Sequence, residues 1–520
     1  MNRIARNVSL AALSLATACA KPAAPPPVET AAKGVLIVDA RVIDGTGAPG
    51  RVASVRLIGD RIADVGDLRQ RPGETIVSGR GLVLAPGFID THSHADGALF
   101  EHRDALADVS QGITTVVVGQ DGGSPYPLAE FFAHAQREPS ALNVASYVGH
   151  GTVRDIVLGK DFKRVATPAE VLKMQELVAQ EMRAGALGLS SGLEYDPGIY
   201  SDPSEVLALA KTAGSMGGRY ISHIRSEDRA FWPALDELIT IGRENHMPVQ
   251  VSHIKLAMKA SWGMGDSLVH VLERARASGV QVTADIYPYA YWHSGMSVLF
   301  PKRDFDNRAS AAFALDQVAP AEGIIVANYG PNAAYSGKTV SELAKMMRVD
   351  DTTALISLLR DSEAAAAKGD TAHEANDVIA TSMDERDITK LLAWMWANFC
   401  TDGELDGTHP RGYGTFPRIL GRYVRDQRIM TLEEAIRKAT SLAAANVGIA
   451  DRGRITVGSY ADLVLFDPET IIDRATPAEP HLTSTGVRRV WVNGATVYES
   501  EHTTDARPGR VLKRVVVAGK

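Results

Sequence analysis

The chain has 520 residues, of which 45% are hydrophobic and 22% are charged, and its formal net charge is -7. This is an ordinary globular composition with ample material for a core, and the length allows several domains or one large barrel with additions. No basic block and no basic patch interleaved with aromatic residues is found along the sequence, which argues against a nucleic-acid partner.

The first residues of the chain are typical of an export signal. Residues 1–20 combine the basic stretch "MNRIARN" with the apolar stretch "VSLAALSLATA", which is too short to span a bilayer. Cys19 follows "LATA" in a pattern that resembles a bacterial lipoprotein box. We therefore expect a lipid anchor on Cys19 and a periplasmic, membrane-anchored protein, with cleavage after Ala20 and simple secretion as the alternative. Residues 21–33, rich in Pro and Ala, are typical of a tether.

The two cysteines limit the covalent chemistry of the chain. Cys400 is the only cysteine besides Cys19. If Cys19 is lipidated or removed, no intramolecular disulfide can form, and a cysteine-based zinc cluster is also excluded.

The pattern of apolar residues predicts an α/β protein with two parts. Residues 34–86 and 447–515 alternate apolar and polar positions between Gly and Asp turns, which predicts one small β-sandwich domain formed from both chain ends. Residues 87–446 alternate apolar strand candidates with amphipathic helix candidates, which predicts a (β/α)8 TIM-type barrel. Residues 302–381 are mostly helical in pattern and are interpreted as an insertion before the last barrel strand.

Polar side chains follow the apolar strand candidates of the barrel, where the active face of a parallel barrel lies. In "GFIDTHSHAD", two histidines two residues apart on an extended strand would point the same way. Taken singly, each is as well explained by a structural histidine, but together the set indicates a metal site. The residues at these strand ends are His92, His94, Asp121, His150, His223, His253 and Asp402.

Several motifs together resemble one enzyme family. "PGFIDTHSHAD" is general to the amidohydrolase superfamily, whereas "SSGLEYDPG", "VSHIK" and "HPRGYGTFPR" are more specific. With "SHIRSED" and "DRGRITVGSYADLVLFDP", they resemble the N-acyl-D-amino-acid deacylases (D-aminoacylases), in order from about residue 34 to residue 467. The resemblance implies a barrel beside a small β-domain, with an insertion before the last strand, as the pattern itself predicts.

The resemblance also implies roles for individual residues. His223 and His253 fall at the tight zinc site, and His92, His94 and Asp402 fall at a second, weaker metal site, where Asp402 is also the proton-transfer residue. Lys255, Tyr287 and Arg411 match positions that hold the substrate α-carboxylate, a task that suits an ammonium, a hydroxyl and a planar guanidinium. Lys255 as an ion-pair partner of the barrel and Tyr287 as packing are the alternatives.

The chain departs from the family at one metal position. Where the best-known members have a cysteine, "GQDGGS" places Asp121. A carboxylate can still bind zinc, but it is a harder ligand, so Mn or Co could also be held. No lysine near "ALGLSSGLEY" could serve as a bridging carbamate, and Glu194 is the nearby carboxylate. One or two zinc ions are therefore expected.

The function implied is hydrolysis of the amide bond of N-acyl-D-amino acids, giving a D-amino acid and a carboxylic acid. A related amidohydrolase acting on dipeptides with a D-residue or on cyclic amides is one alternative, and a non-catalytic binding lipoprotein is another. The side chain and acyl group preferred, the oligomeric state and the number of metal ions are left open by the sequence.

Overall fold

The computed structural model describes residues 34–369 and 375–514. The expected export signal, the tether and Cys19 lie outside the described residues. Among the helices of the described ranges, none is both long enough and apolar enough to cross a membrane.

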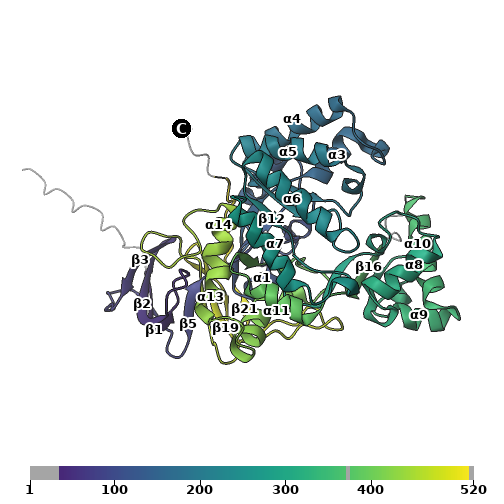
Figure 1. Cartoon of the computed structure of the whole chain (residues 1–520). Coiled ribbons are helices and arrows are strands. Elements are labelled where there is room, and N and C mark those ends of the chain that lie inside the picture. Colours follow the sequence, from purple (N-terminus) through teal and green to yellow (C-terminus); the bar gives the residue numbers. More distant parts are fainter. Residues whose placement is uncertain (1–33, 370–374, 515–520) are drawn as a thin grey trace, which may run out of the picture.

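Strands from both ends of the chain form one nine-stranded sheet at the end of the molecule where the purple strands lie in Figure 1. The two ends meet where β18 pairs antiparallel with β5, so Leu463 lies opposite Pro86. Alternate side chains point inward, and Val55, Leu463 and Trp491 are buried in a core of their own. The strands are β1 Val35–Val42, β2 Arg51–Ile58, β3 Arg61–Gly66, β4 Thr75–Ser78, β5 Val83–Pro86, β18 Leu463–Phe466, β19 Val487–Val492, β20 Ala495–Glu499 and β21 His502–Thr503.

The centre of the chain forms the parallel barrel. Within the described residues, the pairings run from β6 through β7 to β8, and from β9 through β10, β11, β12 and β13 to β17. The barrel strands are β6 Phe88–Asp90, β7 Ile113–Val118, β8 Asn143–Ser146, β9 Val148–Gly149, β10 Gly188–Gly192, β11 Arg219–His223, β12 Val249–Val251, β13 Val282–Ile286 and β17 Ala397–Phe399. The α/β class and the barrel expected from the sequence pattern are confirmed.

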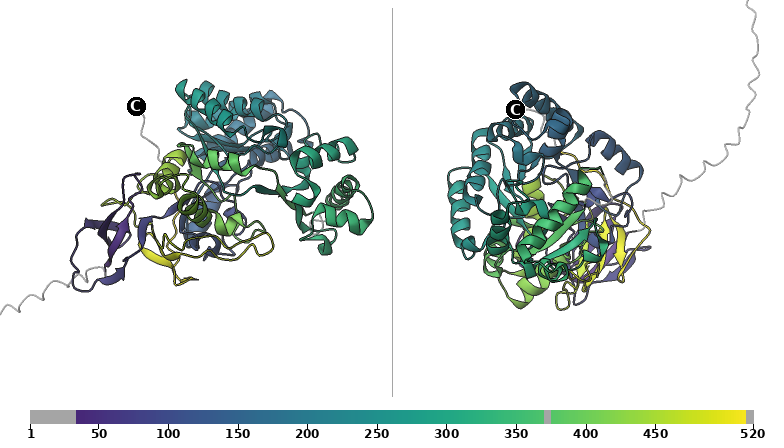
Figure 2. Two further views of the ribbon diagram at one scale, coloured as in Figure 1. Left: turned by 60° about the horizontal axis from the view of Figure 1, so that its bottom comes forward. Right: turned by 90° about the vertical axis from the view of Figure 1, so that its right-hand side faces the viewer.

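Helices pack around the barrel strands, as the two turned views in Figure 2 show. The helix α4 illustrates how the sequence sets these elements: Thr167 caps its start together with Glu170, Pro168 occupies its first turn, and Gly185 ends it. The helices outside the insertion are α1 Leu106–Val109, α2 Leu128–Arg137, α3 His150–Leu158, α4 Pro168–Ala184, α5 Pro203–Ser215, α6 Phe231–Asn245, α7 Gly265–Ala277, α11 Glu385–Ala393, α12 Arg411–Arg418, α13 Leu432–Arg437 and α14 Ala443–Val447.

The predicted insertion is part of a unit that begins before residue 302. β14 pairs with β16, and β16 pairs with β15, so the strands between Tyr291 and Thr381 form a separate three-stranded sheet. Figures 1 and 2 show the unit projecting from the barrel, at the end away from the nine-stranded sheet. Its elements are β14 Tyr291–Gly295, η5 Met296–Leu299, α8 Arg308–Phe313, η6 Ala314–Val318, β15 Ile324–Tyr329, α9 Val340–Met347, α10 Asp351–Ala366 and β16 Asn376–Thr381.

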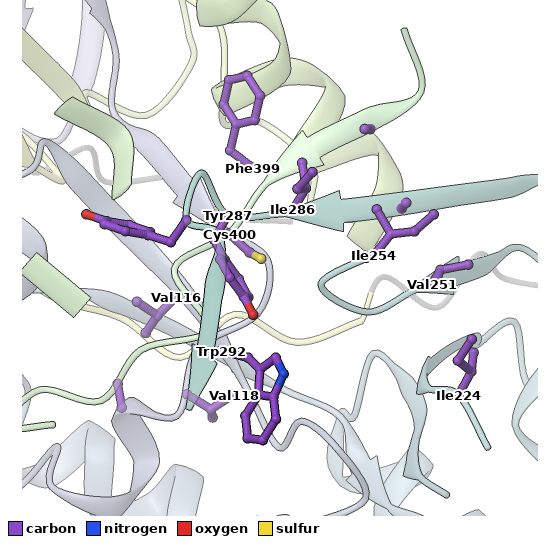
Figure 3. Packing of buried hydrophobic residues seen from close by; sticks show 14 of the residues in the cluster. Val116, Val118, Ile224, Val251, Ile254, Ile286, Tyr287, Trp292, Phe399 and Cys400 are labelled. Atoms are coloured by element: carbon purple, nitrogen blue, oxygen red, sulfur yellow. The ribbon is translucent and has the colours of Figure 1, made fainter. Parts of the chain in front are cut away.

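The barrel core ends directly beneath the candidate site. Figure 3 shows Ile286 and Tyr287 at the end of β13, close to Phe399 and Cys400 at the end of β17. Cys400 is fully buried, and its amide donates a hydrogen bond to the carbonyl oxygen of Ile286. These close-packed strand ends give the polar side chains that follow them a rigid base.

Candidate metal centre and active site

The turns after β6 and β17 are joined by backbone hydrogen bonds. The amide of Asp402 donates to the carbonyl oxygen of His92 at 2.8 Å, and the amide of His94 donates to that of Gly403 at 2.9 Å. The buried Asp90 carboxylate accepts from the amides of both His92 and Thr401. The first and last strands are therefore locked together at the point where both histidines and Asp402 leave the barrel.

One group of ligands gathers where β7, β11 and β12 end. His223 Nδ1 lies 3.2 Å from His253 Nε2, and His253 Nε2 lies 3.4 Å from Asp121 Oδ1. Two ligand atoms about 2.0–2.1 Å from one tetrahedral ion would lie roughly 3.3 Å apart. The spacing of these three atoms is therefore that of a metal-binding group.

A second group faces the other oxygen of Asp121. His92 Nε2 and His94 Nε2 lie 3.4 and 3.5 Å from Asp121 Oδ2, and 3.4 and 3.2 Å from Asp402 Oδ1. No hydrogen-bond partner among the described residues satisfies the buried His92 nitrogens or Asp121 Oδ1. Buried polar atoms are rarely left so, and a cation in each group would satisfy His92 Nε2 and Asp121 Oδ1. The residues therefore fit two adjacent metal ions that share the Asp121 carboxylate.

Three of these ligands have an uncommon backbone conformation. The φ angles of Asp121, His253 and Asp402 are 51°, 33° and 51°, in the left-handed region that residues other than glycine seldom occupy. Such strain costs of order 1–3 kcal/mol per residue and is concentrated at functional sites. All three residues belong to the candidate metal-binding groups.

Two carboxylates orient the histidines of the first group. Glu194 Oε2 lies 2.9 Å from His223 Nε2, and Glu227 Oε1 lies 3.1 Å from His253 Nδ1. Each histidine can donate its outer N–H to a carboxylate and so present its other nitrogen to the metal. The sequence reasoning noted Glu194 only as a nearby acid and missed Glu227, although Glu227 lies in the quoted motif "SHIRSED", four residues after His223.

His150 does not join the centre, which corrects the expectation that it lines the metal site with the other histidines. It begins α3, and its Nε2 lies 2.8 Å from Glu205 Oε1. The same carboxylate pairs with Arg154, and all three side chains are buried. His150 therefore belongs to a buried ion-pair network, the structural role that a single histidine at a strand end often has.

The three residues expected to hold a carboxylate line one cavity. Lys255 Nζ lies 2.7 and 2.8 Å from the two oxygens of Glu227, and Arg411 Nη1 lies 2.6 Å from Asp402 Oδ2. Neither the Tyr287 hydroxyl nor Arg411 Nε has a hydrogen-bond partner in the described part of the chain, and both atoms are buried. These donors face a cavity and are free to bind an anionic group.

The electrostatics of the site keep its acids ionised. Burial would raise the pKa of Asp402, but the charges of Arg411 and His253 outweigh it and hold that pKa well below its usual value. The pKa of Asp121 is also lowered, since His92 and His253 more than offset its burial. Burial raises the pKa of Tyr287, which keeps its hydroxyl protonated as a donor. Both aspartates are thus in the form that binds a cation.

Comparison with known proteins agrees with this geometry. The sequence profile described as "Amidohydrolase family" matches residues 75–320 and 399–498, and the chain belongs to the amidohydrolase family. N-acyl-D-glutamate deacylase of Alcaligenes xylosoxydans xylosoxydans is 35% identical over 91% of this chain and 95% of its own length. D-aminoacylase of the same organism is 34% identical over 92% of this chain and 97% of its own.

A solved structure extends the comparison to three dimensions. N-acyl-D-glutamate deacylase from Bordetella bronchiseptica, crystallised with zinc and a phosphonate that mimics the tetrahedral intermediate, has a TM-score of 0.82 and 34% identity. The match covers 92% of this chain and 99% of that one. The resemblance noted in the sequence motifs is therefore confirmed over most of the chain.

Proposed function

We propose that this protein is a zinc-dependent deacylase that hydrolyses N-acyl-D-amino acids to a D-amino acid and a carboxylic acid. The observation that carries the proposal is the position of the paired ligand groups beside the unpartnered donors of Tyr287 and Arg411. A metal site that opens directly onto anion-binding donors suits an amide whose leaving amine carries an α-carboxylate. The relatives named for deacylation of D-amino acids support the same reaction.

The chain supplies ligands for one or two ions. His223, His253 and Asp121 would hold one, and His92, His94, Asp402 and the shared Asp121 would hold the other. When bound, zinc supplies Lewis acidity, which polarises the acyl carbonyl and makes a neighbouring water acidic near neutral pH. Because Asp121 is a harder ligand than a thiolate, Mn or Co can also be accommodated.

Asp402 carries the proton-transfer role in this proposal. Its Oδ2 is held by Arg411, while its Oδ1 faces His92 and His94. Oδ1 is thus placed to accept the proton of the attacking water and to pass it to the amide nitrogen as the C–N bond breaks. A carboxylate with a low pKa is ionised and ready to accept that proton across the neutral range.

The substrate is held by its carboxylate. The Tyr287 hydroxyl and Arg411 Nε would donate to it, with Lys255 as a third positive group in the same cavity. The substrate would be held at three points, namely its carboxylate, its scissile carbonyl and its side chain. Three contacts together fix which face of the α-carbon is turned toward the metal centre. The preference for the D-enantiomer rests on this three-point contact and on the resemblance to the deacylases.

Matched enantiomers test the proposal. Release of free amine from N-acetyl-D-leucine and N-acetyl-L-leucine is measured at equal enzyme concentration, with a cyclic amide as a third substrate. We expect hydrolysis of the D-enantiomer, little of the L-enantiomer and none of the cyclic amide. Preferred opening of the cyclic amide would assign the protein to the alternative amidohydrolase reaction, and no turnover of any substrate would favour a binding lipoprotein.

We further propose that the protein is exported and anchored through lipid on Cys19. The support is the sequence of residues 1–20, followed by a Pro- and Ala-rich tether. Mass spectrometry of the protein from its native membrane should find an acylated Cys19 at the mature N-terminus. An unmodified N-terminus at Lys21 would instead indicate simple secretion to the periplasm.

A further inference from the structure

An apolar wall lines the cavity that contains the catalytic groups. The wall comes from the insertion unit and from the segment after β12, so the inserted residues shape the active site itself. Trp292 lies on β14, Val298 and Leu299 on η5, and Val318 at the end of η6. With Ala257, they share one cavity with Lys255, Tyr287 and Arg411. Figure 3 shows Trp292 below Tyr287 in the same packed region.

The wall is fixed in position against the metal centre. Arg303 donates to the carbonyl oxygen of Glu194 at 2.8 Å and to Asp196 Oδ1 at 3.0 Å. The same guanidinium donates to the carbonyl oxygen of Ser297 at 3.0 Å, beside the wall residue Val298. The insertion is therefore tied by Arg303 to the loop that carries Glu194, the partner of His223, which anchors the wall beside the site.

Among the described residues that line this cavity, no lysine or arginine is left unpaired for a second anionic group. Lys255 is paired with Glu227, and Arg411 is paired with Asp402. His293 also lines the cavity, and burial together with the charge of Arg411 lowers its pKa to about 4, so it is neutral at physiological pH. The acid Asp228 lines the cavity as well. A side-chain carboxylate entering here would be buried without a positive partner.

The position of the wall indicates which part of a bound substrate it would contact. The side chain leaves the same α-carbon as the carboxylate, so it must lie close to the residues that hold that carboxylate. The wall shares its cavity with Lys255, Tyr287 and Arg411. Of these three residues, Arg411 alone also lines the larger neighbouring cavity, on the His94 side. The acyl group, across the scissile bond, is left to that second cavity, whose rim includes Asp96 and Glu404.

We propose that the wall binds the D-amino acid side chain and selects uncharged, apolar side chains over those of D-glutamate and D-aspartate. This inference rests on the proposed deacylase function and narrows its substrate class. It separates this chain from the relative named for N-acyl-D-glutamate, despite their 35% identity. The physical basis is the cost of burying an unpaired charge, set against the gain from burying an apolar side chain.

Three substrates of similar size test the proposal on the wild-type enzyme. They are N-acetyl-D-leucine, N-acetyl-D-asparagine and N-acetyl-D-aspartate, so polarity and charge change while volume stays nearly constant. We expect kcat/KM to be highest for leucine and lowest for aspartate, with at least a ~100-fold difference between them. Equal or faster hydrolysis of the aspartate substrate would overturn the inference. No hydrolysis of any of the three would instead refute the deacylase function.

A charge placed in the wall gives a second test. Val298 is half-buried, so an arginine there can keep its stem on the wall and its head in the cavity. Val298→Arg should raise the ratio of kcat/KM for N-acetyl-D-glutamate to that for N-acetyl-D-leucine at least ~10-fold, whereas the neutral control Val298→Gln should not. A change in acyl-group preference with an unaltered glutamate-to-leucine ratio would contradict the proposal. If Val298→Arg does not fold, the wild-type substrate series decides.

Discussion

Replacing Asp402 by asparagine separates its chemical role from its structural one. The substitution keeps the shape of the side chain but removes both the proton acceptor and a negative charge. Loss of a general base should lower kcat by about 10²–10⁴. The structure adds a second effect, because Arg411 Nη1 lies 2.6 Å from Asp402 Oδ2 and both side chains are 6% exposed. Breaking such a buried pair costs about 3–5 kcal/mol of unfolding free energy.

The two effects are measured separately. Unfolding in denaturant gives the loss of stability, and kcat per folded molecule gives the loss of chemistry. Glu74→Gln is the matched control, since it breaks the buried pair between Glu74 and Arg56 in the nine-stranded sheet, at 2.5 Å. The control should lose stability and keep kcat within about twofold of wild type, because it touches no group of the site. If Asp402→Asn keeps more than about a tenth of the wild-type kcat, Asp402 is not the general base.

Three further predictions concern other parts of the structure. Arg411→Ala also removes the ion-pair partner of Asp402, so kcat/KM should fall for both an α-carboxylate substrate and its α-amide. In steady-state assays of both, the loss of transition-state stabilisation should be about 2–3 kcal/mol larger for the α-carboxylate, and equal losses on the two substrates would place Arg411 elsewhere. His223→Ala should lose metal and activity together in elemental analysis and turnover assays, and retention of both would exclude it as a ligand. Glu205→Gln should lower the unfolding free energy by about 3–5 kcal/mol at pH 7, because it leaves Arg154 buried without its partner. Burial raises the pKa of Glu205, but pairing with His150 and Arg154 outweighs burial, so the pKa in the folded protein is lower than the unfolded value of 4.5. The stability contributed by Glu205 is therefore fully present above pH 4.5 and is lost as the pH falls through the folded pKa. The gap between wild type and Glu205→Gln in urea unfolding should therefore narrow in acid, and a gap that widens there would contradict the assignment.

The barrel and the β-domain could be predicted from the sequence because the patterns that indicate strands and helices are local and periodic. Alternating strands at both chain ends and repeated strand-then-helix units each predict their own element, and the motif residues mark the strand ends. The structural elements that depend on pairing between distant segments could not be predicted. β14 joins the insertion unit only because it pairs with β16, about ninety residues later, and no local pattern announces such a register.

The same distinction holds within the site. His92, His94, Asp121, His223, His253 and Asp402 follow strand ends and were predicted as ligands, and the structure brings their side chains together. His150 also follows a strand, yet it pairs with Glu205, since the end of a strand does not fix which way the next side chain turns. The loss of stability expected for Asp402→Asn could not be predicted from the sequence, because the contact with Arg411 is visible only in three dimensions.

Zinc titration of the metal-free enzyme tests the central claim most directly. The protein is stripped with a chelator, and the rate of D-leucine release from N-acetyl-D-leucine is followed as zinc is restored and bound zinc is counted. We expect no turnover without metal and recovery of activity as the first ion or the first two ions bind. Full activity in protein shown by elemental analysis to hold no metal would contradict the account.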